Sequence, residues 1–166
     1  MWIIALDGSK GAGKSTLSSE LLKRYPEAKE VSLDKERRSQ GYQTTSFEIN
    51  KAVFETMKPK LDQLLSDKNN VIVDCGLNDI RITALKEAAN KHQARLEMIF
   101  LTAPYDVLLQ RVEERSRTQG RSNNRQRFEE VYKLVHDKDL SDYTVLDSSG
   151  LSTTEIADKI EGLLTS

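Results

Sequence analysis

The 166-residue chain lacks several features that mark particular classes of protein. Its single cysteine, Cys75, excludes an internal disulfide and a cluster of thiolates around a metal, which fits a reducing compartment. No apolar run approaches the roughly 20 residues that cross a bilayer, and no cationic stretch followed by an apolar one opens the chain. We therefore expect a cytoplasmic protein with no membrane span and no signal peptide.

An excess of charge of one sign is also missing. Lys and Arg number 25 against 26 Asp and Glu, so the net charge of -1 draws the chain as a whole neither to nucleic acid nor to an anionic membrane. The three prolines stand singly, and no linker, repeat or low-complexity tract interrupts the sequence. With 37% hydrophobic residues the chain can bury a core, so we expect one domain over residues 1–166 and no extended disorder.

The sequence does show an alternation of short apolar runs with amphipathic segments. Strand-like runs occupy residues 2–7, 30–33, 71–75, 96–101 and 143–146, and several are apolar without alternation, as in strands buried on both faces. Helical periodicity fills the segments between them. This alternation predicts a parallel sheet with helices on both faces, in which ligands bind at the carboxyl ends of the strands.

Some helix boundaries are also predicted. Capping-box patterns begin at Thr45 and at Ser152, each with a Glu three residues later. Pro59 lies inside the helical segment at residues 46–66, and because proline removes a backbone donor we expect a kink or a break there.

A phosphate-binding pattern follows the first strand directly. Residues 8–15 match G-x-x-x-x-G-K-[ST] in full and precede a helical segment, which is the Walker A arrangement. The backbone N–H groups of such a turn surround phosphates, Lys14 reaches the β- and γ-phosphates, and Ser15 holds Mg²⁺ through its hydroxyl. The residues predicted to bind nucleotide here are Gly8, Ser9, Lys10, Gly11, Ala12, Gly13, Lys14, Ser15 and the adjacent Thr16.

The apolar strand at residues 71–74 ends in a carboxylate, Asp74, as a Walker B element does. Together with the P-loop, this position makes Asp74 a candidate for holding Mg²⁺ from its outer coordination sphere or for contacting an acceptor. A strand that ends in Asp is equally typical of a cap for the next helix, so both interpretations stand at this point.

What happens to the γ-phosphate depends on the rest of the chain. A guanine-specifying N-K-x-D sequence is absent, which favours ATP, and a motor ATPase usually needs a longer chain. Between residues 111 and 127 there are six arginines and two acids, with Arg111 and Arg115 on one helical face. A mobile lid at about residues 115–125 would exclude water from a kinase site, while a solvated charged helix end is the simpler alternative.

An acidic and a basic residue, Asp34 and Arg37, follow the second predicted strand at residues 30–33. Asp34 can take a proton from an acceptor hydroxyl, and Arg37, three residues later, can hold a neighbouring phosphate. The alternative is that Asp34 merely caps the helix that follows.

These elements together resemble the P-loop kinases of the polynucleotide kinase and zeta-toxin-like group. The resemblance implies an α/β fold with a five-stranded parallel sheet in the order 2-3-1-4-5. It also implies that Asp34 is the general base for a 5'-hydroxyl, that Arg37 positions the acceptor, that Arg115 stabilises the transition state and that Arg111 lies against adenine. The sequence departs from the group after Asp74, where Cys75, Gly76 and Leu77 replace a short Thr-Asn pair that contacts the acceptor.

The function predicted from the sequence is transfer of the ATP γ-phosphate, with Mg²⁺, to the 5'-hydroxyl of a polynucleotide. A kinase for a nucleoside, a nucleoside monophosphate or another small acceptor is the first alternative, and a nucleotide-binding regulatory module without transfer is the second. Tyr42 and Phe47 offer rings on which a base could stack, although Phe47 fits a core position better.

Overall fold

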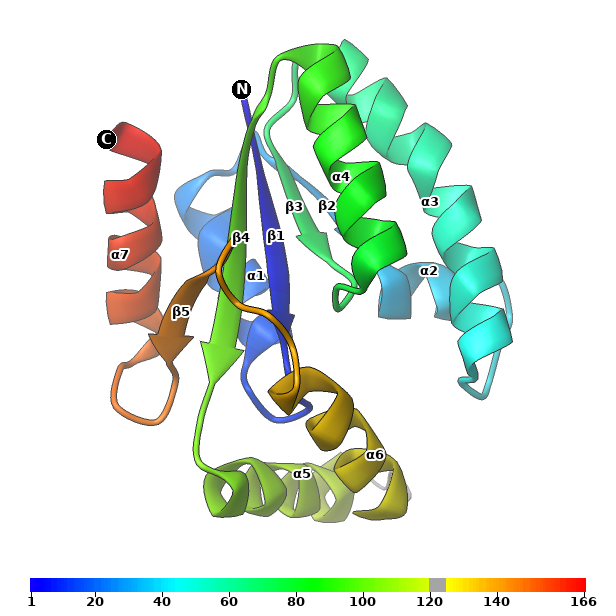
Figure 1. The fold of residues 1–166 in the computed structure, drawn as a ribbon, viewed down its shortest axis with the longest axis vertical. Coiled ribbons are helices and arrows are strands. Elements are labelled where there is room, and N and C mark those ends of the chain that lie inside the picture. Colours follow the sequence, from blue (N-terminus) through cyan, green and yellow to red (C-terminus); the bar gives the residue numbers. More distant parts are fainter. Residues whose placement is uncertain (120–124) are drawn as a thin grey trace.

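The computed structural model describes residues 1–119 and 125–166. Its sheet has five parallel strands in the order β2-β3-β1-β4-β5, which confirms the predicted fold class and strand order (Figure 1). The strands are β1 (Trp2–Gly8), β2 (Lys29–Ser32), β3 (Val71–Asp74), β4 (Arg95–Thr102) and β5 (Thr144–Asp147). Each lies within about one residue of its predicted position, because unbroken apolar runs are a strong local signal.

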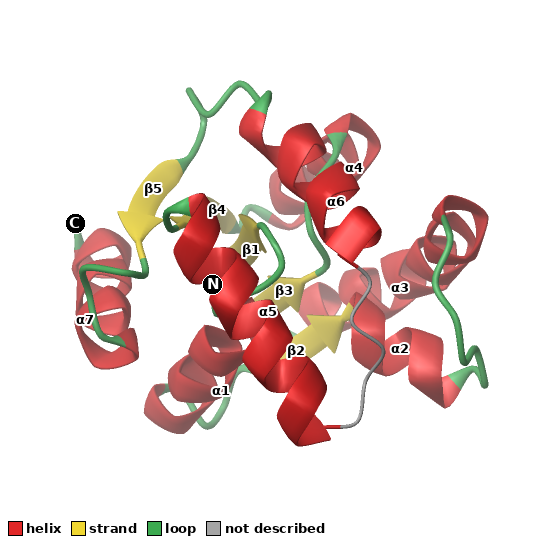
Figure 2. Cartoon of the chain, turned by 90° about the horizontal axis from the view of Figure 1, so that it is seen from below, coloured by secondary structure: helices red, strands yellow, loops and turns green. Residues whose placement is uncertain are grey.

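Helices connect the strands and cover both faces of the sheet. They are α1 (Lys14–Arg24), α2 (Leu33–Ser39), α3 (Phe47–Ser66), α4 (Asp79–His92), α5 (Tyr105–Gln119), α6 (Arg125–His136) and α7 (Thr153–Thr165). Helices α1 and α7 lie on one face, and α3 and α4 on the other (Figure 1). Seen from below, α5 and α6 cross the carboxyl ends of the strands (Figure 2). The carboxyl ends of the strands, at the bottom of Figure 1, are therefore where a ligand site is expected.

The core lies on both sides of β1. Ile3 and Ala5 face the apolar cluster beneath α3 and α4, whereas Ile4 and Leu6 face the cluster beneath α1 and α7. All four side chains are 0% exposed. Burial of both faces explains why this strand is apolar without alternation, and it fixes the end of β1, where the glycine-rich loop begins.

Among the predicted helix details, a break at Pro59 and a cap at Thr45 were wrong, and the capping box at Ser152 is confirmed. Helix α3 runs unbroken through Pro59, which is exposed, so the carbonyl that loses its partner lies on the solvent face of the helix. Its N-cap is Ser46 rather than Thr45, with Ser46 Oγ accepting from the Ile49 N–H at 3.1 Å. The capping box of Ser152 with Glu155 is present as predicted.

No helix in the described part of the chain is long and apolar enough to cross a membrane.

Candidate active site

The loop between β1 and α1 depends on glycine at two positions. Gly8 has φ of 132°, and a Cβ there would lie 2.3 Å from the carbonyl oxygen of Leu101 in β4. At Gly11, where φ is 83°, a Cβ would lie 2.8 Å from the carbonyl oxygen of Leu108 in α5. Side chains at these positions would clash with backbone that cannot move aside, so the two glycines allow the loop to lie close against β4 and α5. The loop begins at Ser9, which is buried.

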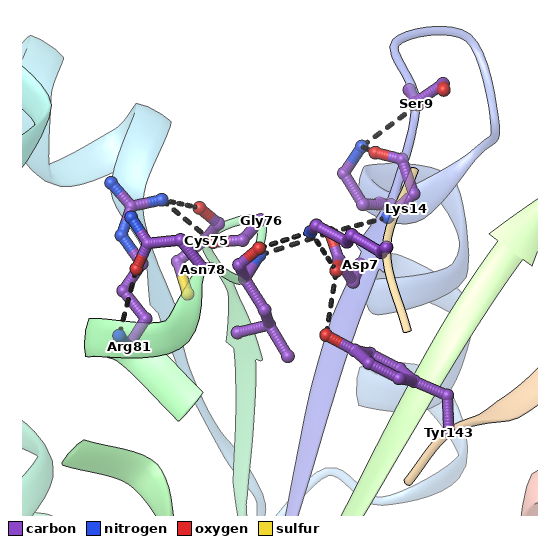
Figure 3. A network of polar contacts seen from close by, with 11 residues as sticks. Asp7, Ser9, Lys14, Cys75, Gly76, Asn78, Arg81 and Tyr143 are labelled. Atoms are coloured by element: carbon purple, nitrogen blue, oxygen red, sulfur yellow. Dashed lines mark hydrogen bonds and ion pairs between the residues drawn. The ribbon is translucent and has the colours of Figure 1, made fainter. Parts of the chain in front are cut away.

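Lys14 folds back over this loop. Its ammonium group donates to the carbonyl oxygens of Gly8 at 2.7 Å and Ser9 at 3.1 Å (Figure 3). Burial lowers the pKa of Lys14, and the nearby carboxylates of Asp74 and Asp7 act in the opposite direction. The cation thus lies inside the loop, at the place where phosphates bind in a Walker A arrangement.

The two predicted Mg²⁺ residues lie side by side although they are 59 positions apart. Ser15 Oγ donates to Asp74 Oδ2 at 3.0 Å, because β3 pairs with β1 and places Asp74 opposite Leu6. Asp74 is 9% exposed, and burial raises the pKa of its carboxyl group, while Lys14 and Ser15 partly offset this rise. A hydroxyl beside a carboxylate is a set of hard oxygen donors that suits Mg²⁺. The cap interpretation of Asp74 is wrong, since Asn78 caps α4.

A pocket of about 430 Å³ opens beside the loop. Its walls come from the glycine-rich loop and the start of α1, from α5, and from the segment that joins β5 to α7. Thr16 and Arg115 line it, and both are exposed. Ala12, which also lines it, is 0% exposed. Its position next to the phosphate loop makes it the candidate site for the nucleoside part of a nucleotide.

Arg111 holds two walls of this pocket together. Its guanidinium donates to the carbonyl oxygen of Gly11 at 3.2 Å and to Ser148 at 3.0 Å (Oγ) and 2.8 Å (carbonyl oxygen). These contacts join the phosphate loop to the turn after β5. Contact of Arg111 with adenine stays a prediction, and so does the role of Arg115 in the transition state.

The acceptor-side residues follow β2, next to β3. Arg37 and Asp34 form an ion pair of 3.0 Å, in which the Asp34 side chain is 59% exposed and the Arg37 side chain is 16% exposed. Ser32 caps α2, with its Oγ accepting from the Lys35 N–H at 3.4 Å, so the interpretation of Asp34 as the cap is wrong. The registry of Ser32 with Asp74 places the end of β2 beside the end of β3. The Asp34 carboxylate is therefore accessible to solvent at the carboxyl ends of the strands, where the P-loop also lies.

Charges from α2 and α6 act on Lys10 of the P-loop. Lys10, at the tip of the P-loop, has its pKa lowered by partial burial and by the guanidinium groups of Arg127 and Arg37, and raised by Asp34. The charge of Asp34 also acts on Lys14 and Asp74. The P-loop, α2 and α6 thus contribute to one electrostatic environment.

Sequence reasoning missed the residues that hold the P-loop at its start. Asp7 is 1% exposed and accepts hydrogen bonds from Lys138 at 2.6 Å and Tyr143 at 3.0 Å (Figure 3). The available signal was a carboxylate at the end of an otherwise apolar strand. Arg81, near the start of α4, could have contributed a cation to a groove for nucleic acid. Instead its guanidinium donates to the carbonyl oxygens of Cys75 at 2.6 Å and Gly76 at 2.8 Å.

The predicted lid is described only at its ends. Residues 120–124, including Arg121, lie outside the described residues, while α5 ends at Gln119 and α6 begins at Arg125.

Cys75 in the β3–α4 connection is buried, and desolvation raises the pKa of its thiol to about 12. A thiol with so high a pKa is not a nucleophile near neutral pH.

A parallel sheet in this order, with a Walker A loop after its first strand, defines the P-loop kinase fold. A protein-family model described as "AAA domain" (AAA_33) matches residues 3–135, and the chain belongs to that family. Membership implies nucleotide binding, and the fold is that of kinases. No curated protein sequence matches the chain significantly.

Solved structures share the fold at low sequence identity. A candidate kinase from Chloroflexus aurantiacus j-10-fl has a TM-score of 0.77 and 16% identity, with 97% of each chain covered. The tunicamycin resistance protein of Deinococcus radiodurans has a TM-score of 0.69 and 20% identity, with 98% of this chain and 95% of that chain covered. A gluconokinase from Sinorhizobium meliloti 1021 has a TM-score of 0.69 and 17% identity, with 95% and 88% covered.

Proposed function

We propose that the chain is an ATP- and Mg²⁺-dependent phosphotransferase whose acceptor is a hydroxyl group, first of all the 5'-hydroxyl of a polynucleotide. The observation that carries the proposal is the exposed Asp34 carboxylate, paired with Arg37, at the same sheet edge as Lys14, Ser15 and Asp74. A base for an acceptor proton and a phosphate-binding loop on one edge are the parts that phosphoryl transfer needs. On this proposal, residues 1–166 work as one domain.

Each residue has a distinct task in this proposal. Lys14 and the loop N–H groups bind the phosphates, and Asp34 accepts the proton of the attacking hydroxyl. Ser15 and Asp74 would hold Mg²⁺, which when bound neutralises phosphate charge. Arg115 and the segment at residues 115–125 would exclude water and stabilise the charge that develops.

Exposed aromatic residues between α2 and the first residue of α3 favour a polynucleotide acceptor. Tyr42 is 38% exposed and Phe47 is 63% exposed, so the prediction of Phe47 as a core residue was wrong. Both residues follow the exposed Arg38 in the sequence, after the helix that carries Asp34 and Arg37. Exposed aromatic rings near cations are the usual surface on which unpaired bases stack.

One observation favours a small hydroxyl acceptor instead. Arg81 is engaged by the carbonyl oxygens of Cys75 and Gly76, so it is not directed toward a nucleic acid backbone. Structures that share the fold include a gluconokinase as well as a chain of an RNA repair complex, of which this chain covers 43%. A small-metabolite kinase is therefore the second candidate.

A transfer assay with γ-labelled ATP and Mg²⁺ tests the proposal. The acceptors are a DNA and an RNA oligonucleotide with a 5'-hydroxyl, the same oligonucleotides blocked by a 5'-phosphate, and a set of nucleosides and sugars. Label on the unblocked oligonucleotides alone is the expected result. Label only on a small acceptor would support the second candidate, and ATP binding without any labelled product would support a binding module without transfer.

A further inference from the structure

The carboxylate of Asp7 lies at the junction of three parts of the molecule. One oxygen accepts from the N–H groups of Gly8 at 2.8 Å and Leu77 at 3.1 Å. The other accepts from the ammonium group of Lys138 at 2.6 Å and the hydroxyl of Tyr143 at 3.0 Å. Asp7 thus joins the start of the P-loop, the β3–α4 connection and the segment that follows α6 (Figure 3).

A carboxylate in this position competes with the phosphates of a nucleotide for the ammonium group of Lys14. Asp7 is 1% exposed and accepts from the N–H of Gly8, the residue whose carbonyl oxygen accepts from Lys14, so the two charged groups bind one residue. After Asp74, it is the carboxylate that most raises the pKa of Lys14. Lys14 nevertheless donates to the carbonyl oxygens of Gly8 and Ser9, which are neutral partners that phosphate oxygens can readily replace. A cation beside Asp7 would offset its negative charge and reduce its attraction for Lys14.

The positive charge that offsets Asp7 comes from Lys138. Its side chain is 20% exposed, and it contacts both Asp7 and the carbonyl oxygen of Leu77. It lies two residues beyond the end of α6, so the same short segment that leaves α6 also pairs with the P-loop strand. Tyr143, just before β5, completes the set; burial and the Asp7 carboxylate raise the pKa of its hydroxyl, which keeps it a donor.

We propose that Lys138 is a positioning residue that neutralises Asp7 and thereby leaves the ammonium group of Lys14 free to bind the phosphates of ATP. The inference rests on the proposed function, because it presumes that ATP is the ligand of the loop. Without Lys138, the Asp7 carboxylate attracts Lys14 and weakens phosphate binding at a distance from the phosphates themselves. The segment after α6 thus controls the affinity of the P-loop.

Equilibrium binding of ATP with Mg²⁺ by purified full-length variants tests this proposal, since it needs no acceptor. Lys138→Met is expected to weaken binding about tenfold, in line with the coupling of residues in one polar network. Lys138→Arg is expected to bind like the parent protein. The double variant Asp7→Asn/Lys138→Met is expected to recover binding to within about threefold, since its two neutral side chains leave no charge to offset. Lys159→Met, an exposed change on α7, is the matched control.

Each outcome decides the inference. Unchanged binding by a folded Lys138→Met variant would overturn it, and so would a loss that persists in the double variant, because the effect would then be structural. If Lys138→Met does not fold, Asp7→Asn alone decides: binding at least as tight as that of the parent protein supports the inference, and weaker binding overturns it. A parent protein that does not bind ATP would overturn the proposed function, and the inference with it.

Discussion

On the nucleotide side of the site the phosphate loop is held by backbone groups and by the half-buried Arg111, whereas on the acceptor side the Asp34 carboxylate and the Phe47 ring are exposed to solvent. Gly8 and Gly11 lie against the backbone of β4 and α5, and Arg111 joins the loop to the turn after β5. Asp34 and Phe47, by contrast, are 59% and 63% exposed. Contacts that are already present before binding favour one ligand, while an exposed surface accommodates different ones. The comparison teaches why the nucleotide class is easier to identify than the acceptor.

The largest effect is expected on the nucleotide side. Lys14→Ala removes the cation that lies inside the loop, so phosphoryl transfer should fall by about a thousandfold or more. ATP hydrolysis and transfer to the preferred acceptor, measured with labelled ATP, check this result. Lys159→Ala on α7 is the control and should transfer at the parent rate. Activity that survives in Lys14→Ala would contradict the assignment of the loop.

Asp34→Asn separates the two sides. It removes the proposed base without removing a hydrogen bond or an ion pair to the P-loop, so kcat should fall roughly a hundredfold while ATP affinity stays within about twofold of the parent value. Steady-state kinetics and equilibrium ATP binding check the two halves of this statement. The exposed Asp67→Asn should change neither. A comparable loss of ATP binding in Asp34→Asn would mean that the two sides are not independent.

Asp74→Asn should lower activity and raise stability. Transfer is expected to fall about tenfold, as it does when outer metal-site partners are removed. Burial raises the pKa of Asp74 above its ordinary value of 3.8, so the folded chain favours the protonated group. That stabilisation is present below pH 3.8 and is lost as pH rises through the raised pKa.

The variant, neutral at every pH, should therefore be more stable than the parent at pH 7 and equal to it in acid. Urea unfolding at pH 7 and at pH 3.5 measures the difference, since roughly half or more of an unfolded aspartate is protonated there. The exposed Asp67→Asn provides the reference. An Asp74→Asn variant that is less stable than the parent at pH 7 would show that the attraction between Asp74 and the charge of Lys14 outweighs the cost of burial.

The smallest effect is expected at the exposed rings. Phe47→Ala should raise KM for a 5'-hydroxyl oligonucleotide about fivefold, which corresponds to the loss of one stacked base, and leave KM for ATP unchanged. Leu134→Ala is matched, because Leu134 is a large apolar residue that is 71% exposed on α6. An equal change in both variants would argue against a role for Phe47 in acceptor binding.

The comparison also explains what the sequence could predict. The five strands and the P-loop could be predicted because apolar runs and the G-x-x-x-x-G-K-S pattern are local signals. The strand order was implied by the resemblance to P-loop kinases, and the pairing of Ser15 with Asp74 by the Walker A and Walker B patterns taken together. The Asp7 network could not, because its partners Lys138 and Tyr143 are 131 and 136 residues away and no local pattern marks them. Phe47 was misjudged because helical periodicity does not reveal which end of a helix extends beyond the sheet.

The central place of β1 in the sheet has a consequence for how the chain is made. β1 is synthesised first, but its neighbours β3 and β4 end at residues 74 and 102. At about 5–20 residues per second, this largely apolar strand waits roughly 3–13 seconds for β3 and roughly 5–19 seconds for β4 during synthesis. The strand that carries the phosphate loop is thus the segment most in need of protection during translation, and slowing synthesis after residue 74 should lower the yield of folded protein.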